Sequence, residues 1–256
     1  MATSSNTLDV TIPTSWEELT DSQLKMFYRV MAAGIDTMTA KVRIAFTGSG
    51  LALIGQLQDM SGWLVGRQEG KKKQVYKLTT LQVAQMVERL RFLDEMPAMP
   101  VRPAKIARRK AVAADFEGVP FQDFLFVESC YQGYLKTENP SFLDEMTNAL
   151  LNCRRRLSNE ERMAVFFWVT GLKQYLAVRY PDLFKPADEA ADGNLLGAPN
   201  PADKVGDSIN AMLRALTGGD PTKEELVLAL DTHRALTELD AQARESAEIS
   251  RKYGKS

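Results

Sequence analysis

The chain has 256 residues, 45% of them hydrophobic and 25% charged, so it is long enough to bury a sizeable core, and its composition argues against wholesale disorder. Its formal net charge of -1 argues against a general nucleic-acid binder, because phosphate affinity comes mainly from accumulated Lys and Arg. Cys130 and Cys153 are the only cysteines. They are too few for a disulfide framework or a zinc motif and fit a reducing compartment.

Neither a secretory signal nor a membrane segment is predicted. The polar stretch from Met1 to Val10 lacks the basic and apolar regions of a signal peptide. The most apolar run, from Met163 to Val178, contains Lys173 and Gln174 and is shorter than the roughly 20 residues of a membrane span. We therefore expect a cytoplasmic protein.

The first predicted helix begins at Thr20 and ends at Gly34. Thr20 and Gln23 have the spacing of a capping box, in which each side chain binds the backbone amide of the other residue. A second helix is expected from Thr39 to Phe46, before the glycine-containing break at residues 48–50.

Residues Gly62 to Leu78 are predicted to form a β-hairpin, because apolar residues flank a polar segment with glycines and lysines. Thr80 is the expected cap of the next helix, which should end before Pro97. The prolines that follow should keep the chain extended; they are Pro97, Pro100 and Pro103.

Three helices are expected in the middle of the chain. Pro120 to Leu135 is rich in aromatic residues and should be one buried helix, and Ser141 to Leu151 should be another. Ser158 and Glu161 have capping-box spacing and begin the third. Its apolar residues occupy all sides, which predicts a position at the centre of a bundle. The aromatic residues of the first are Phe121, Phe124, Phe126, Tyr131 and Tyr134.

Small and polar residues between Lys185 and Asp203 indicate a linker. A short amphipathic helix follows, ended by Gly218 and Gly219. Asp220 should then cap a long final helix with Pro221 at its first position.

The predicted fold is mainly α: a helical bundle with a small β-hairpin and a tethered C-terminal helical pair. Residues 1–184 are expected to form a mainly helical core domain with the hairpin near 62–78. Residues 185–203 are the predicted flexible linker, and residues 204–256 the C-terminal amphipathic helices.

The sequence offers little catalytic chemistry. His233 is the only histidine, and it shares a helical face with Leu226, Leu230 and Leu236, which predicts a contact or partly buried residue. The glycine-rich segments lack the spacing of phosphate-binding loops, and neither histidines nor cysteines cluster as metal ligands do. We expect no enzyme activity, no catalytic residue, no cofactor and no metal.

Two basic clusters could contact nucleic acid or an acidic partner, although solvated charged loops explain them more simply. No aromatic residues are interleaved with them to stack on bases, so we expect no nucleic-acid partner. The first cluster is Lys71 to Lys73, and the second is Arg102, Lys105, Arg108, Arg109 and Lys110.

The C-terminal helices have too little sequence to form a core of their own. Their apolar stripe must pack on the main domain, on a second copy of the chain or on a partner helix. The candidate partner-binding residues on this stripe are Leu213, Leu216, Leu226, Leu230, His233 and Leu236.

Three segments carry a family resemblance: IPTSWEELTDSQL from Ile12 to Leu24, GVPFQDFLFVESCYQGYL from Gly118 to Leu135, and NAMLRALTGGDPTKEELVLALDTHRALTELDA from Asn210 to Ala241. The chain resembles uncharacterised tail-region proteins of Bacteroidetes phages and prophages, in the gene cassette where tail assembly chaperones are found. The resemblance implies a protein of the bacterial host cytoplasm that binds the long tape-measure protein before the tail tube polymerises. It implies no active site.

The leading hypothesis is therefore a non-catalytic phage tail assembly chaperone that binds the tape-measure protein. One alternative is a structural tail or head–tail connector subunit, whose hairpin could pair with another copy in a homo-oligomeric ring. The last-ranked alternative is an enzyme that uses carboxylates on nucleic acid near the basic cluster.

Overall fold

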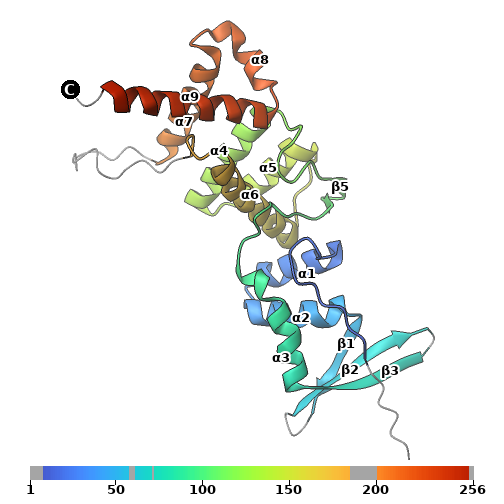
Figure 1. The fold of residues 1–256 in the computed structure, drawn as a ribbon. Coiled ribbons are helices and arrows are strands. Elements are labelled where there is room, and N and C mark those ends of the chain that lie inside the picture. The colour runs from blue at the N-terminus through green and yellow to red at the C-terminus, as the bar shows by residue number, and fades with distance from the viewer. Residues whose placement is uncertain (1–7, 58–60, 71, 185–200, 254–256) are drawn as a thin grey trace, which may run out of the picture. The chain divides into compact units, whose positions relative to one another are not determined.

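A computed structural model describes residues 8–57, 61–70, 72–184 and 201–253; the side chains of Glu69, Ser250 and residues 201–205 are not described. In these ranges the chain is mainly helical, with a three-stranded and a two-stranded antiparallel sheet (Figure 1). The predicted fold class is confirmed.

The chain divides into two compact units. The N-terminal unit comprises residues 1–97 and 158–164, and the C-terminal unit comprises residues 98–157 and 165–256. This division differs from the predicted one, because the helices after residue 200 share one hydrophobic core with residues between Ile106 and Phe184. The predicted linker lies outside the described residues up to residue 200, and its last three residues already belong to a helix.

The helices of the N-terminal unit pack around a core that includes Phe27, Tyr28 and Ile44. The capping box of Thr20 and Gln23 is present as predicted. The predicted cap at Thr80 is wrong: Thr79 caps that helix, because Gln82 stands three residues after Thr79 and the two side chains complete a capping box. These helices are α1 (Asp21–Ala32), α2 (Thr37–Gly48), α3 (Thr80–Arg89) and the 3-10 turn η1 (Arg91–Asp94).

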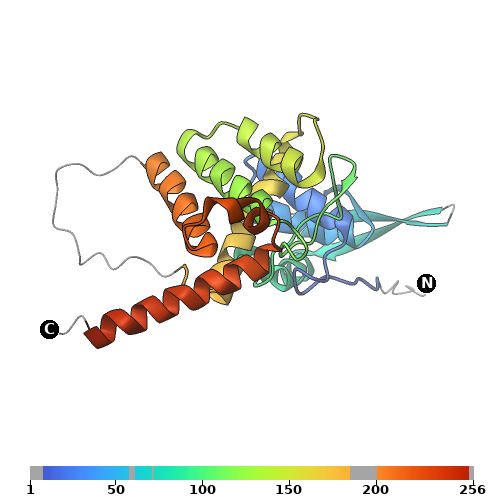
Figure 2. The ribbon, with the colours of Figure 1, turned by 90° about the horizontal axis from the view of Figure 1, so that it is seen from above.

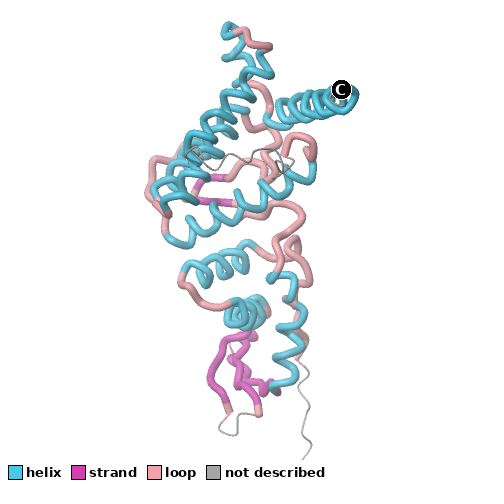
Figure 3. Tube along the Cα trace, turned by 90° about the vertical axis from the view of Figure 1, so that its left-hand side faces the viewer, coloured by secondary structure: helices cyan, strands magenta, loops and turns pink. Residues whose placement is uncertain are grey.

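The three-stranded sheet of this unit contains β1 (Leu51–Gln56), β2 (Gly62–Glu69) and β3 (Lys72–Thr79), coloured magenta in Figure 3. The strands are antiparallel in the order β1-β2-β3, so β2 is the central strand. The predicted hairpin is confirmed as β2 and β3, while β1 was not predicted. One face of the sheet buries Val65 and Leu78.

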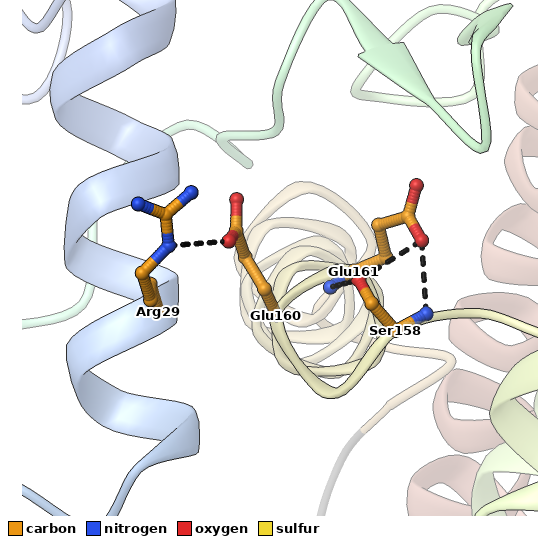
Figure 4. A network of polar contacts seen from close by, with 4 residues as sticks. All are labelled: Arg29, Ser158, Glu160 and Glu161. Atoms are coloured by element: carbon orange, nitrogen blue, oxygen red, sulfur yellow. Dashed lines mark hydrogen bonds and ion pairs between the residues drawn. The ribbon is translucent and has the colours of Figure 1, made fainter.

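The beginning of α6 (Asn159–Arg179) belongs to the N-terminal unit. Figure 4 shows the polar contacts around it. The predicted capping box of Ser158 and Glu161 is confirmed: Ser158 Oγ accepts from the amide of Glu161 at 3.3 Å, and Glu161 Oε2 accepts from the amide of Ser158 at 2.9 Å. Arg29 Nε on α1 donates to Glu160 Oε2 at 2.8 Å. Of these bonds, the one between Arg29 and Glu160 joins the start of α6 to α1.

The rest of α6 lies in the core of the C-terminal unit, as its apolar sequence predicts. Trp168, Leu172 and Leu176 are almost fully buried. Trp168 Nε1 also donates to the carbonyl of Ala114 at 2.7 Å, so its polar atom is satisfied inside the core. No helix in the described part of the chain has both the length and the apolar character that a membrane crossing requires.

Most of the other elements of the C-terminal unit contribute residues to the same hydrophobic core as α6. The helix predicted to be buried, Pro120 to Leu135, does bury Phe121, Phe124 and Tyr131, whereas the side chain of Phe126 is exposed. The elements are β4 (Lys105–Ile106), β5 (Arg109–Lys110), α4 (Phe121–Thr137), α5 (Ser141–Leu151), α7 (Pro201–Thr217), the 3-10 turn η2 (Pro221–Lys223), α8 (Glu224–Leu228) and α9 (Thr232–Tyr253).

The predicted single long helix after Asp220 is wrong. The chain there forms η2, α8 and α9, with a break between Leu228 and Thr232. Asp220 does cap the first of these, by accepting from the amide of Thr222 at 3.0 Å. The break exists because the backbone around Asp231 pairs with a distant segment, which a continuous helix could not do.

Candidate functional site

The six residues predicted to bind a partner lie on α7, α8 and α9 and in the break between α8 and α9. Leu236 is fully buried and belongs to the core, so its side chain offers nothing to a partner. Leu213, Leu216 and Leu230 are partly buried and pack against the same core. Leu226 is exposed. The predicted stripe therefore combines core residues with residues that a partner can reach.

The break between α8 and α9 attaches the C-terminal helices to the rest of their unit. The amide of Phe121 donates to the carbonyl of Leu230 at 2.7 Å, and the amide of Thr232 donates to the carbonyl of Val119 at 2.9 Å. Together they form an antiparallel bridge between Pro120 and Asp231. Of the three packing arrangements left open by the sequence, packing on the same chain is present in the structure.

Asp231 reinforces this attachment with both of its carboxylate oxygens. Oδ2 accepts from the amide of Gly118 at 2.8 Å, and Oδ1 accepts from the amide of Arg234 at 3.2 Å in the first turn of α9. The same side chain thus caps α9 and holds the segment that leads into α4. Further along α9, Asp240 Oδ1 accepts from the amides of Asp182 and Leu183 at 2.9 and 3.0 Å.

His233 is a docking residue. Its Nε2 lies 2.8 Å from the carbonyl oxygen of Asp115, and because a carbonyl only accepts, Nε2 carries the proton. Nδ1 then accepts from the hydroxyl of Tyr180, also at 2.8 Å. Both ring nitrogens are bonded within the chain, and the ring is partly buried, as predicted. This arrangement leaves neither nitrogen directed at a substrate.

A groove of about 490 Å³ lies beside these contacts. Leu216 of α7 and Leu230 contribute its apolar part, and Thr237 lies between two charged residues of α9, Arg234 and Glu238. A groove with apolar walls and charges of both signs fits side chains of an amphipathic helix. Two of the predicted residues, Leu216 and Leu230, therefore meet at one concave site.

The last turns of α9 extend beyond the helices of the C-terminal unit (Figures 1 and 2). We call Arg244–Tyr253 the α9 end; its described side chains are exposed. Ile249 and Tyr253 are 59% and 75% exposed, and their spacing of four residues places them on one helical face. The sequence prediction missed both, although an apolar pair at this spacing within a charged stretch was a visible signal.

The basic clusters take up different positions. Lys72 and Lys73 lie on β3, and Arg102 is partly buried, with Nη1 donating to the carbonyl of Pro103 at 3.1 Å and its guanidinium over the ring of Trp168. The remaining basic residues of the second cluster are exposed on the β4–β5 hairpin; they are Lys105, Arg108, Arg109 and Lys110. They form a charged loop with no aromatic platform among them.

Cys130 and Cys153 are both buried free thiols. Burial, and secondarily the negative charge of Glu145, raise the pKa of the Cys130 thiol to about 12. A nucleophilic cysteine needs the opposite shift, because the thiolate is the reactive form. Cys130 is therefore a core residue of the C-terminal unit.

We predict that Cys130 does not react with Ellman's reagent at about pH 8 until the unit unfolds, because the thiol is both buried and protonated. A Cys153→Ser variant leaves Cys130 as the one thiol that can react.

The raised pKa of the Cys130 thiol also means that the unfolded chain releases this proton at a lower pH than the folded chain. The stability of the parent relative to Cys130→Ala should thus be constant below about pH 9 and decline above it. Rapid native labelling, or a difference that does not change with pH, would contradict the assignment.

Within the described ranges, no group of three or more His, Cys, Asp or Glu side chains could hold a metal ion. No protein-family model, curated protein or solved structure matches the chain. Among the features described above, the groove and the α9 end are the ones suited to contact another protein.

Proposed function

We propose that the protein is a non-catalytic phage tail assembly chaperone that binds the tape-measure protein in the cytoplasm of the bacterial host, before the tail tube polymerises. The observation that carries this proposal is the α9 end, a solvated helix that exposes Ile249 and Tyr253. The resemblance of three segments to phage tail-region proteins supports the same function.

The physical reason is the hazard that a long helical protein presents before assembly. Its unpaired apolar helical faces aggregate unless something covers them. The α9 end can lie along such a face with Ile249 and Tyr253, while the groove beside Leu216 and Leu230 takes further side chains. Burial stabilises a complex by about 1.5–3 kcal/mol for each apolar side chain, before the costs of association are subtracted. A contact of only a few side chains is therefore weak enough for the partner to be released later.

We predict that Ile249→Glu/Tyr253→Glu abolishes the solubility that the parent chain gives a co-expressed tape-measure protein, because two carboxylates replace the apolar contact. The free energy of unfolding should stay within about 0.5 kcal/mol of the parent value, since both side chains are exposed. The soluble fraction of the tape-measure protein and a urea titration of the purified variant provide the two measurements.

The matched control is Arg244→Gln/Arg251→Gln. It changes the net charge by the same amount, and helical spacing places both arginines on the side of α9 opposite Tyr253. The control should solubilise the tape-measure protein as the parent does. If the tape-measure protein is as soluble with Ile249→Glu/Tyr253→Glu as with the parent chain, the proposal is contradicted. Deleting everything after Lys185 is a poor test, because Leu236 and Leu239 in that region belong to the core.

The second candidate is a structural tail or head–tail connector subunit. The three-stranded sheet favours it, since β1 and β3 are its outer strands and an outer strand can pair with a strand of another copy. Mass spectrometry of purified virions separates the two functions. A connector remains in the particle at a fixed copy number, whereas a chaperone leaves before the tail is complete.

A further inference from the structure

The sheet of the N-terminal unit has a second face that the unit does not cover. Gly66 on the central strand pairs with Ala52 on β1 and with Val75 on β3, and Leu64 pairs with Lys77. Residues directly opposite each other in antiparallel strands share a face. We call this side the cationic sheet face; its residues include Ala52, Ile54, Leu64, Gly66, Gln68, Lys73, Val75 and Lys77.

Gly66 fixes which side chains lie on this face. A Cβ added there would come within 2.5 Å of Cε of Lys73 and 3.2 Å of Cδ1 of Ile54. Both side chains therefore lie over the glycine, where a larger residue would stand. Ile54 comes from the irregular position of β1, between Leu53 and Gly55, where the register shifts.

The two faces of the sheet differ in exposure. On the opposite face Val65 is fully buried and Leu78 nearly so, whereas Leu53, which stands opposite Val65 on the outer strand β1, is exposed. On the cationic sheet face, Ile54 and Val75 are 47% and 56% exposed. Clustered apolar side chains that are exposed to water on one face of a small sheet indicate a surface at which a partner can bind.

The charges on this face have one sign. Lys73 and Lys77 are its charged residues, both exposed, while β1 and β3 contain no acidic residue. In the register of the two strands, the backbone of Glu69 stands opposite Lys72, whereas Lys73 stands opposite Gln68. A basic partner would be repelled here, and an acidic one attracted.

We propose that the cationic sheet face binds an amphipathic segment of a partner protein in which apolar residues are flanked by Asp or Glu. The apolar residues cover Ile54, Leu64 and Val75, and the carboxylates reach the ammonium groups of Lys73 and Lys77. Nucleic acid fits less well, because the centre of the face is aliphatic and offers no ring on which bases can stack. This site does not depend on the α9 end, so either can fail without the other.

The experiment uses the full chain and two synthetic helical peptides with the same leucine pattern, one carrying Glu and the other Lys at the flanking positions. Fluorescence anisotropy gives the affinities, and backbone amide shifts in the labelled protein locate the site. The Glu peptide should bind with shifts on β1–β3, and the Lys peptide should not. Added salt should weaken binding, since it screens the attraction between the lysines and the carboxylates of the peptide.

The variants compare adjacent lysines on opposite faces. Lys73→Glu should lower the affinity for the Glu peptide at least tenfold. Lys72→Glu makes the same change of charge one residue earlier, and it should change that affinity less than twofold. Val75→Thr keeps the branched shape and the strand preference while removing apolar contact, and should weaken binding several-fold.

Equal binding of the two peptides, equal effects of Lys72→Glu and Lys73→Glu, or shifts confined to residues outside the sheet would overturn the proposal. So would displacement of the Glu peptide by a single-stranded oligonucleotide at equal concentration, or sedimentation showing that a second copy of the chain occupies the face. Far-UV circular dichroism verifies that each variant is folded.

Discussion

Replacing Asp231 with alanine should lower the free energy of unfolding of the C-terminal unit by about 2–3 kcal/mol. The substitution removes the side-chain cap of α9, which contributes about 1 kcal/mol. It also removes a carboxylate acceptor from the amide of Gly118, a hydrogen bond to a charged group that contributes about 1.5–3 kcal/mol when well formed. The site is partly exposed, so we expect a loss near or slightly below the lower end of the summed range.

Asp231→Asn separates the two contributions. The carboxylate uses Oδ1 for Arg234 and Oδ2 for Gly118, while an asparagine has a single acceptor oxygen and can keep only one of these bonds. Stability should therefore fall in the order Asp, Asn, Ala. Asp207→Ala, an exposed acidic position on α7, is the control and should leave stability within about 0.5 kcal/mol.

The measurements are urea titrations followed by tryptophan fluorescence, combined with hydrogen exchange. Amides in the first turns of α9 and around Val119 should exchange faster in Asp231→Ala, while amides of the β1–β3 sheet should not change. If Asp231→Ala matches Asp207→Ala in both measurements, the docking of the C-terminal helices does not depend on this side chain.

The elements whose signals are local could be predicted from the sequence. The boxes at Thr20 and Ser158 involve residues three positions apart, so their hydrogen bonds are decided within one turn. The hairpin of β2 and β3 follows from two strand-like runs around a short polar turn. Gln82 follows Thr79 at the same spacing, so the local signal for the third cap also lies in the sequence, at Thr79 and not at Thr80.

The break before α9 could not be predicted, because its cause lies about a hundred residues away. The sequence from Pro221 onward has good helical periodicity, yet the backbone at Leu230 and Thr232 bonds to Phe121 and Val119. A tertiary contact of this kind overrides local preference. The division into units has the same origin, since the core that α9 shares with α4 and α6 is formed by residues far apart in sequence.

At the candidate site, amphipathic periodicity predicts burial of a helical face but does not identify the chain that covers it. A stripe of leucines predicts that one helical face is covered, without telling whether the same chain or a partner covers it. Leu236 is in the core, Leu226 is exposed, and both belong to the same predicted stripe. Ile249 and Tyr253 are exposed apolar residues outside the predicted stripe, and they are the side chains to which we assign a partner in our proposal.

In the N-terminal unit, Asp94→Ala should lower the free energy of unfolding by about 2 kcal/mol, whereas Lys41→Met should be neutral or stabilising. The side chain of Lys41 is only 8% exposed, and its Nζ lies 2.5 Å from Oδ2 of Asp94. Removing the carboxylate leaves a buried ammonium without its partner, which costs about 3–5 kcal/mol in fully buried pairs. Asp94 is 52% exposed, so water can replace part of the lost interaction, and we expect less than that range.

Lys41→Met removes the charge and the free-energy cost of desolvating it. The methionine side chain is unbranched and of similar length, so it fills most of the same buried space. In that background Asp94→Ala should have almost no effect, because its partner is already gone. The double-mutant cycle should therefore return a coupling free energy of about 2 kcal/mol in urea titrations of the four chains. Strong destabilisation by Lys41→Met, or additive losses in the double variant, would show that Lys41 contributes through contacts other than its ion pair with Asp94.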